Sequence, residues 1–140
     1  MSDYELKRFK LLADLAGDEL ETVEELIESR QFAAGDQLFR EGQESDGLLL
    51  LHEGRLGVES SRWGKLDDVE PGAVVGALAL VVVGPREVTA VALEPSCVLL
   101  LSRTAFHRLA DDAPRAAARV LESLLRDLAG ALRGGLDHLG

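Results

Sequence analysis

Histidine, cysteine and paired carboxylates are the residues that most often carry catalysis or hold metal ions, and in this chain they are scattered. His52, His107 and His138 form neither an HxH pair nor an HExxH motif, so a metal site lacks ligands at a usable spacing. The carboxylate pairs Asp67–Asp68 and Asp111–Asp112 are typical of solvated turns and helix caps. The chain contains no GxSxG, P-loop or GxGxxG motif. The sequence therefore predicts no catalytic residue, no metal site and no enzyme activity.

Cys97 is the only cysteine, which excludes an internal disulfide and a site made of several cysteines. It begins the apolar part of SCVLLLS, and a free cysteine in such a run is usually buried. A catalytic thiol would need neighbours that lower its pKa, and the local sequence offers none. Cys97 is therefore expected in the core.

The length and the charge of the chain limit its partners. The 140 residues suit one domain, and the net charge of −10 repels polyphosphate, so nucleic-acid binding is disfavoured. The longest apolar run, Ala73–Val83, is too short for a transmembrane helix, and the first residues lack the apolar region of a secretory signal. We expect a cytoplasmic protein with no membrane or nucleic-acid partner.

The elements that must position any site change in character along the chain. Apolar residues at helical spacing predict helices over Tyr4–Leu15 and Asp18–Ser29, with Asp18 and Glu21 as a capping box. Residues 32–101 then form short apolar runs separated by glycine or acidic turns, a pattern typical of a β-sandwich, jelly roll or barrel. The expected strands are Gln37–Arg40, Leu48–His52, Arg55–Glu59, Lys65–Val69, Ala73–Val75, Val88–Leu93 and Cys97–Leu101.

Helix is expected again over residues 103–133, with Ser102 as an N-cap and Pro114 in the first turn of the last helix. The remaining residues, GGLDHLG, are expected to fray. The last helix carries two apolar stripes, one of which can face the barrel and the other a partner, although both could pack on one core. The stripe that we assign to a homodimer or a protein partner is Ala117, Leu121, Leu124 and Leu128; the second is Ala118, Leu125 and Leu132.

Two segments of the sequence resemble the cyclic-nucleotide-binding domain family. The stretch FAAGDQLFREGQESDGLLLLHEGRLGV is similar to its opening strands through Gly35, Leu38, Phe39, Gly42, Asp46, residues 48–51 and Gly54. The stretch VGALALVVVGPREVTAVA is similar to its phosphate-binding cassette through Gly76, Leu78, Ala79, Leu80, Pro85, Arg86 and Thr89. The resemblance covers nearly the whole chain, and it implies a mainly β jelly-roll barrel with N-terminal helices and a long C-terminal helix.

The resemblance also implies a ligand site. In the family a short helix after the glycine presents backbone N–H groups to the phosphate of cyclic AMP or cyclic GMP, and the arginine neutralises the phosphate. The residues that correspond here are Gly76, Ala77, Leu78, Arg86, Glu87 and Thr89. Ala77 replaces the glutamate that binds the ribose, and Glu87 stands where the family has a small residue. Two positions of the implied site are thus altered.

These departures favour a regulatory module with a degenerate cassette and no cofactor, which acts through a protein partner or a homodimer. A sensor that binds a cyclic nucleotide or another small anion through Arg86 is the alternative, and a metal-free cupin is a remote one. Three further expectations concern side chains near the cassette. Arg86 lies at the surface or pairs with Glu87, Val81–Val83 belong to the core, and Trp63 packs against the barrel from a hairpin tip.

Overall fold

The computed structural model describes residues 5–139 and, beyond Gly130, only the side chain of Arg133. Two 3-10 helices, η1 (Leu6–Arg8) and η2 (Lys10–Leu12), precede helix α1 (Gly17–Leu26). The strands are β1 (Glu28–Phe32), β2 (Gln37–Phe39), β3 (Gly47–Glu53), β4 (Leu56–Ser60), β5 (Gly64–Lys65), β6 (Val74–Val75), β7 (Thr89–Ala92) and β8 (Ser96–Ser102). A 3-10 helix, η3 (Ala77–Leu80), follows β6, and α2 (Arg103–Asp112) and α3 (Pro114–Leu139) end the chain.

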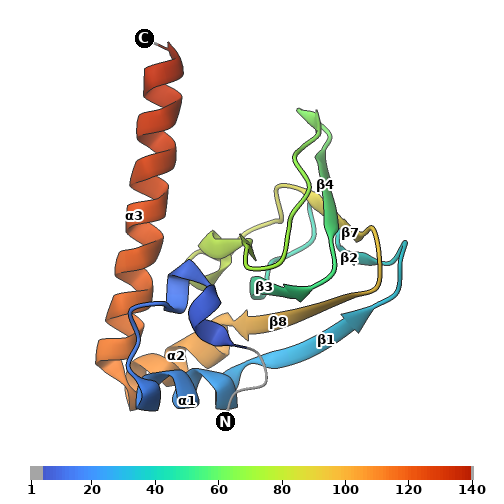
Figure 1. Cartoon of the computed structure of the whole chain (residues 1–140). Helices are drawn as coiled ribbons and strands as arrows, with labels where there is room; N and C mark the ends of the chain where they lie inside the picture. The colour runs from blue at the N-terminus through green and yellow to red at the C-terminus, as the bar shows by residue number, and fades with distance from the viewer. Residues whose placement is uncertain (1–4, 140) are drawn as a thin grey trace.

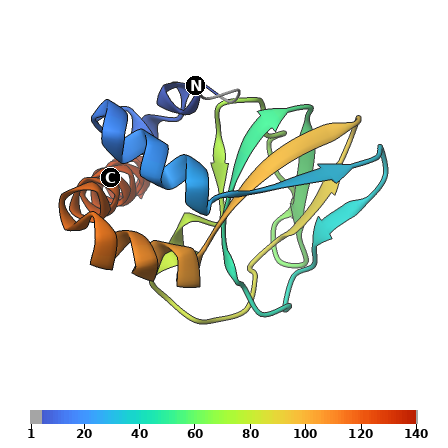
Figure 2. The same cartoon turned by 90° about the horizontal axis from the view of Figure 1, so that it is seen from below.

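The strands form two four-stranded antiparallel sheets, ordered β1-β8-β3-β6 and β2-β7-β4-β5. The helices gather on one side of these sheets, and α3 projects beyond the rest of the molecule (Figures 1 and 2). The expected mainly β fold with flanking helices is confirmed. In the described part of the chain no helix is both long and apolar enough to cross a bilayer.

The two central strands β3 and β8 are buried on both faces because an apolar layer lies on each side. Leu48, Leu50, Leu99 and Leu101 belong to the core cluster under the helices, whereas Leu49, Leu51, Val98 and Leu100 belong to the cluster between the sheets. This arrangement explains why the two strands are continuous leucine and valine runs instead of alternating polar and apolar residues. Cys97 is buried among the first cluster, as expected.

The N-terminal part differs from the sequence-based expectation in three ways. In the described part of the helix expected over Tyr4–Leu15, the chain forms the two 3-10 helices η1 and η2 instead of one helix. Helix α1 starts at Gly17 with Ala16 as its N-cap, and the Glu19 carboxylate accepts the Ala16 N–H at 2.8 Å, so the capping box placed on Asp18 is wrong. The helix ends at Leu26, so Glu28 and Ser29, which were expected in it, instead begin strand β1 (Glu28–Phe32), paired with β8. This strand was missed because it is polar and half-exposed, and its pairing with a distant strand leaves no local signal. Tyr4, the expected start of the first helix, lies outside the described residues.

The C-terminal helices begin where the sequence predicts. The Ser102 hydroxyl accepts the Ala105 N–H at 3.0 Å, and Pro114 is the first residue of α3. Helix α3 continues to Leu139, so the end expected near residue 133 is wrong. Of the strand expected over Lys65–Val69, only Lys65 belongs to a strand, and Val69 forms an isolated bridge with Leu56.

Candidate ligand-binding cassette

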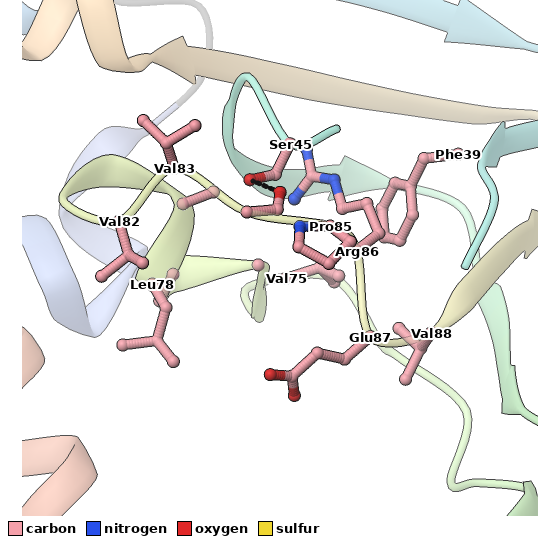
Figure 3. A pocket seen from close by; sticks show the side chains of 14 residues that line it. Phe39, Ser45, Val75, Leu78, Val82, Val83, Pro85, Arg86, Glu87 and Val88 are labelled. Carbon is pink, nitrogen blue, oxygen red and sulfur yellow. Dashed lines mark hydrogen bonds between the residues drawn. The ribbon is translucent and has the colours of Figure 1, made fainter. Parts of the chain in front are cut away.

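A pocket of about 500 Å³ lies between η3, the loop that follows it and the end of β2. Its walls are largely apolar, and Figure 3 shows Leu78, Val82, Phe39 and Val88 around it. The sequence marked six residues as a ligand site, and five of them line this pocket: Gly76, Ala77, Leu78, Arg86 and Glu87. Thr89 does not line it. The fold therefore brings most of the predicted site together.

Gly76 shapes the start of η3. Its φ of 73° lies in the left-handed region, which favours glycine, and a Cβ at this position would collide with Nη1 of Arg86. The chain turns at Gly76 so that Ala79 and Leu80 face the core while Leu78 stays half-exposed on the pocket side. The first N–H groups of such a short helix have no partner within the helix. They are the donors that the family resemblance assigns to a phosphate.

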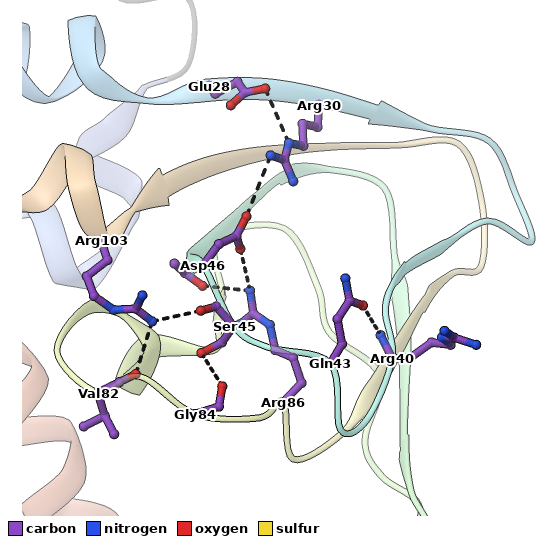
Figure 4. Close-up of polar contacts among 11 residues, drawn as sticks. Glu28, Arg30, Arg40, Gln43, Ser45, Asp46, Val82, Gly84, Arg86 and Arg103 are labelled. Carbon is purple, nitrogen blue, oxygen red and sulfur yellow. Dashed lines mark hydrogen bonds and ion pairs between the residues drawn. The ribbon is translucent and has the colours of Figure 1, made fainter.

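Arg86 is held inside the protein, with only 7% of its surface exposed. Its backbone is fixed on both sides, because Arg86 N–H donates to the Gln43 carbonyl at 2.7 Å and its own carbonyl accepts the Gly42 N–H at 2.8 Å. Its Nη2 donates to the Gly47 carbonyl at 2.9 Å and to Asp46 Oδ1 at 3.2 Å. Figure 4 shows this ion pair at the centre of a polar network.

An aromatic ring and a second cation complete the surroundings of Arg86. The guanidinium carbon lies 4.4 Å from the centroid of the Phe39 ring, a cation–π contact. Burial lowers the pKa of Arg86, and the Asp46 carboxylate opposes this shift. Asp46 is shared, because its Oδ2 lies 3.9 Å from Nη2 of Arg30. Asp46 thus offsets only part of the charge of Arg86, and among the described residues its Nη1 is buried without a hydrogen-bond acceptor.

This geometry corrects the expectation that Arg86 is a surface arginine or the partner of Glu87. Asp46 is the carboxylate that pairs with Arg86. Glu87 is exposed, and its carboxylate points away from the guanidinium in Figure 3. The sequence placed Asp46 in the family pattern of the opening strands, but the spacing of forty residues gave no reason to link it to Arg86.

Thr89 has a structural role that the sequence did not reveal. Its hydroxyl accepts the Glu41 N–H at 3.0 Å and so ties the start of β7 to the turn after β2. Ala77, half-buried, packs its methyl group against the core cluster under the helices. Neither residue offers a carboxylate to a sugar hydroxyl.

Arg103 is a residue that sequence reasoning missed. Its Nη2 donates to the Ser45 carbonyl at 2.9 Å and to the Val82 carbonyl at 3.2 Å (Figure 4). The Ser45 hydroxyl in turn donates to the Gly84 carbonyl at 2.9 Å. Arg103 is the first residue of α2, so it links that helix to the loop that borders the pocket. The sequence indicated only that Arg103 follows the Ser102 cap at the start of a helix, and not that it reaches the loop beside the pocket.

Val81–Val83 and Trp63 are exposed, which contradicts the expectation that they are packed. Each of the three valines is more than half exposed, and Val82 and Val83 line the pocket. Trp63 is 70% exposed next to β5. An apolar residue is buried only where another part of the chain covers it, and no described part of the chain covers these four.

The apolar residues of α3 divide between the core and solvent. Ala117 and Leu124 are buried against the chain itself, and Leu121 is partly buried there. Leu128 and, on the second stripe, Leu125 are exposed. The side chain of Leu132 lies outside the described ones. The stripe that we assigned to a partner therefore serves the internal core over most of its length, and dimerisation stays a prediction.

The model of the cyclic nucleotide-binding domain family matches residues 29–113, and the chain belongs to this family. This membership sets aside the metal-free cupin. The solved N-terminal domain of a transcriptional regulator from Streptomyces coelicolor A3(2) has a TM-score of 0.82 and 28% identity, covering 90% of this chain and 93% of that one.

Curated relatives are regulators. The HTH-type transcriptional regulator Cmr of Mycobacterium tuberculosis is 32% identical over 80% of this chain and 47% of its own length. The cAMP-dependent protein kinase regulatory subunit of Candida albicans is 26% identical over 74% of this chain and 23% of its own length. The chain thus spans between about a quarter and a half of these two relatives.

Proposed function

We propose that this protein is a non-enzymatic regulatory module that acts in the cytoplasm through protein–protein contacts, and that its cassette does not bind cyclic AMP or cyclic GMP tightly. The observation that carries the proposal is the position of Arg86. Its guanidinium is buried, and its Nη2 is already bonded to Asp46 and to the Gly47 carbonyl, so a phosphate would compete with a carboxylate for this arginine.

Two further changes weaken the cassette. Ala77 cannot accept hydrogen bonds from a ribose, and losing a charge-assisted bond costs about 1.5–3 kcal/mol. The Glu87 carboxylate borders the pocket, and a unit charge about 5 Å from a phosphate costs about 3 kcal/mol at an effective dielectric constant of about 20. Together these terms would move a micromolar site towards millimolar affinity.

Exposed apolar residues beside the cassette support a role in protein contacts. Leu78, Val82 and Val83 line the pocket with much of their surface open to solvent. A cluster of this kind on a small domain is typical of a partner site. The similarity to a transcriptional regulator and to a protein kinase regulatory subunit supports a regulatory role.

Calorimetry tests the proposal directly. Cyclic AMP and cyclic GMP are titrated into the native protein and into the double variant Ala77→Glu plus Glu87→Ala. The matched control is Glu25→Ala, which removes an exposed carboxylate on α1 that does not line the pocket. We expect no heat of binding from the native protein and the control at nucleotide concentrations up to about 1 mM, and binding at least about 100-fold tighter in the double variant. Micromolar binding by the native protein would refute the proposal.

One observation favours the alternative, a sensor for a cyclic nucleotide or another small anion. Nη1 of Arg86 is buried beside Gly76 at the pocket wall, and no residue that the structure describes accepts a hydrogen bond from it. A sensor would show a thermal shift with its anion, and Arg86→Lys would abolish that shift, because lysine cannot reproduce the forked geometry of arginine.

A further inference from the structure

The hairpin between β4 and β5 ends in an exposed aromatic side chain that has no role within the chain's core. The side chain of Trp63 is 70% exposed, and its backbone N–H donates to the Ser60 hydroxyl at 2.7 Å. The Arg62 guanidinium lies 4.9 Å from the centroid of the indole ring. In Figure 1 this hairpin, beyond the label of β4, stands away from the body of the molecule. The tip thus presents a flat apolar group and a cation together.

The pocket of the cassette has the complementary character. Leu78, Val82 and Val83 provide an open apolar wall, and the volume of about 500 Å³ is ample for an indole ring. Glu87 lines the same pocket, and no cation within the described residues forms an ion pair with it. Because Asp46 already pairs with Arg86 while Glu87 has no such pair, the pocket favours an apolar group next to a cation over an anion.

We propose that the Arg62–Trp63 tip of a second copy of this chain occupies the pocket. The indole packs on Leu78, Val82 and Val83, and the Arg62 guanidinium pairs with Glu87. Trp63 has the highest exposed fraction of the large apolar side chains in the described part of the chain, and its neighbour carries the charge that the pocket lacks. The inference rests on the proposed function, because it requires a pocket that no cyclic nucleotide fills.

The contact is expected to be reciprocal. One hairpin tip in one pocket buries less area than a stable interface needs, whereas two such contacts related by a two-fold axis double the area and close the assembly. A one-way contact would instead add copies into open chains. The net charge of −10 on each copy opposes association, so the dimer is expected to be weak.

Trp63 is the single tryptophan of the chain, and the tryptophan fluorescence therefore reports on the surroundings of this hairpin tip alone. Emission and sedimentation velocity are measured on the full chain without nucleotide, from about 1 µM to about 500 µM. We expect a dimer to appear over this range, together with a shift of the emission to shorter wavelength as the indole leaves water.

Four variants separate this interface from others. Val83→Asp and Glu87→Arg each leave Trp63 in place and are expected to raise the dissociation constant at least about tenfold. The charge swap Arg62→Glu plus Glu87→Arg restores the ion pair and is expected to return the constant to within about threefold of the native value. Leu125→Asp alters the exposed side of α3 and is expected to leave both signals unchanged.

A protein that stays monomeric with solvent-exposed tryptophan emission at every concentration would overturn the inference. So would a dimer without the emission shift, or one lost in Leu125→Asp, because α3 would then be the interface. The proposed function fails by a different result, micromolar binding of a cyclic nucleotide in calorimetry. The two failures are therefore distinguishable.

Discussion

At the scale of single residues, the cassette depends on the mutual fit of Gly76 and Arg86. The glycine has left-handed backbone geometry and leaves room for Nη1 of the arginine, while Asp46 and the Gly47 carbonyl hold Nη2. An arginine in this position stabilises the turn between β6 and β7 whether or not a ligand is present. Its presence in the family motif is therefore no proof of phosphate binding in this chain.

Gly76→Ala tests this fit. The added Cβ must displace Arg86 and adopt a positive φ, so we expect a loss of about 1–3 kcal/mol in the free energy of unfolding, measured by urea denaturation. Gly84→Ala is the matched control, because a Cβ at Gly84 meets nothing within 4 Å. Equal stability of the two variants would show that Arg86 is not held as described.

At the scale of elements, the β4–β5 hairpin is tied to the turn after β2 through Glu41. The Ser61 N–H donates to Glu41 Oε1 at 3.0 Å. Hydrogen bonds from the Ser61 hydroxyl and then from its N–H lower the pKa of Glu41 below its ordinary value of 4.5. A carboxyl whose pKa is lowered by folding stabilises the folded protein when the pH is above its ordinary pKa. This contribution disappears as the pH falls through the pKa of the folded protein.

Ser61→Ala removes the hydroxyl and keeps the backbone donor. The pKa of Glu41 is expected to rise towards 4.5, as followed by carbon NMR of its carboxyl group during an acid titration. Ser29→Ala is the control: the Ser29 hydroxyl contacts Cys97 within the sheet formed by β1, β8, β3 and β6, and its removal is expected to leave that titration unchanged. An unchanged pKa in Ser61→Ala would contradict the hydrogen bond.

Helix α3 places two adjacent leucines in different surroundings. Leu124 is buried against the core, whereas Leu125 is 65% exposed. Leu124→Ala is expected to lower the unfolding free energy by about 2–4 kcal/mol, and Leu125→Ala to change it by less than about 0.5 kcal/mol. Thermal denaturation of both variants measures the difference, and comparable losses would mean that Leu125 is covered in solution.

At the scale of the whole molecule, one sheet joins the two apolar layers. Neighbouring residues of β8, such as Leu99 and Leu100, point into different core clusters. The helices and the second sheet are therefore stabilised through the same strands. This arrangement predicts that the chain unfolds as one unit.

Leu99→Ala and Leu100→Ala test the coupling. Each is expected to cost about 2–5 kcal/mol because each leaves a cavity in a dense core. In calorimetry both variants should keep a single transition in which the calorimetric and van't Hoff enthalpies agree. A separate early transition in one of them would show that the two layers unfold independently.

The sequence alone determined the features that depend on nearby residues. Continuous apolar runs predicted β3 and β8, and the Ser102 cap and Pro114 placed the starts of α2 and α3. These signals are local, because backbone conformation and helix caps depend on residues a few positions apart. The resemblance to the family motifs then indicated the barrel and five residues that line the pocket.

Only the tertiary structure decided which groups meet across the sequence. It paired Arg86 with Asp46, joined Arg103 to the Val82 carbonyl and made a strand of Glu28–Phe32. It also left Val82 and Trp63 exposed, although both types of residue are usually packed. The physical reason is that burial and ion pairing depend on which distant segment lies opposite a side chain. The spacing of residues along the sequence does not determine which segment that is.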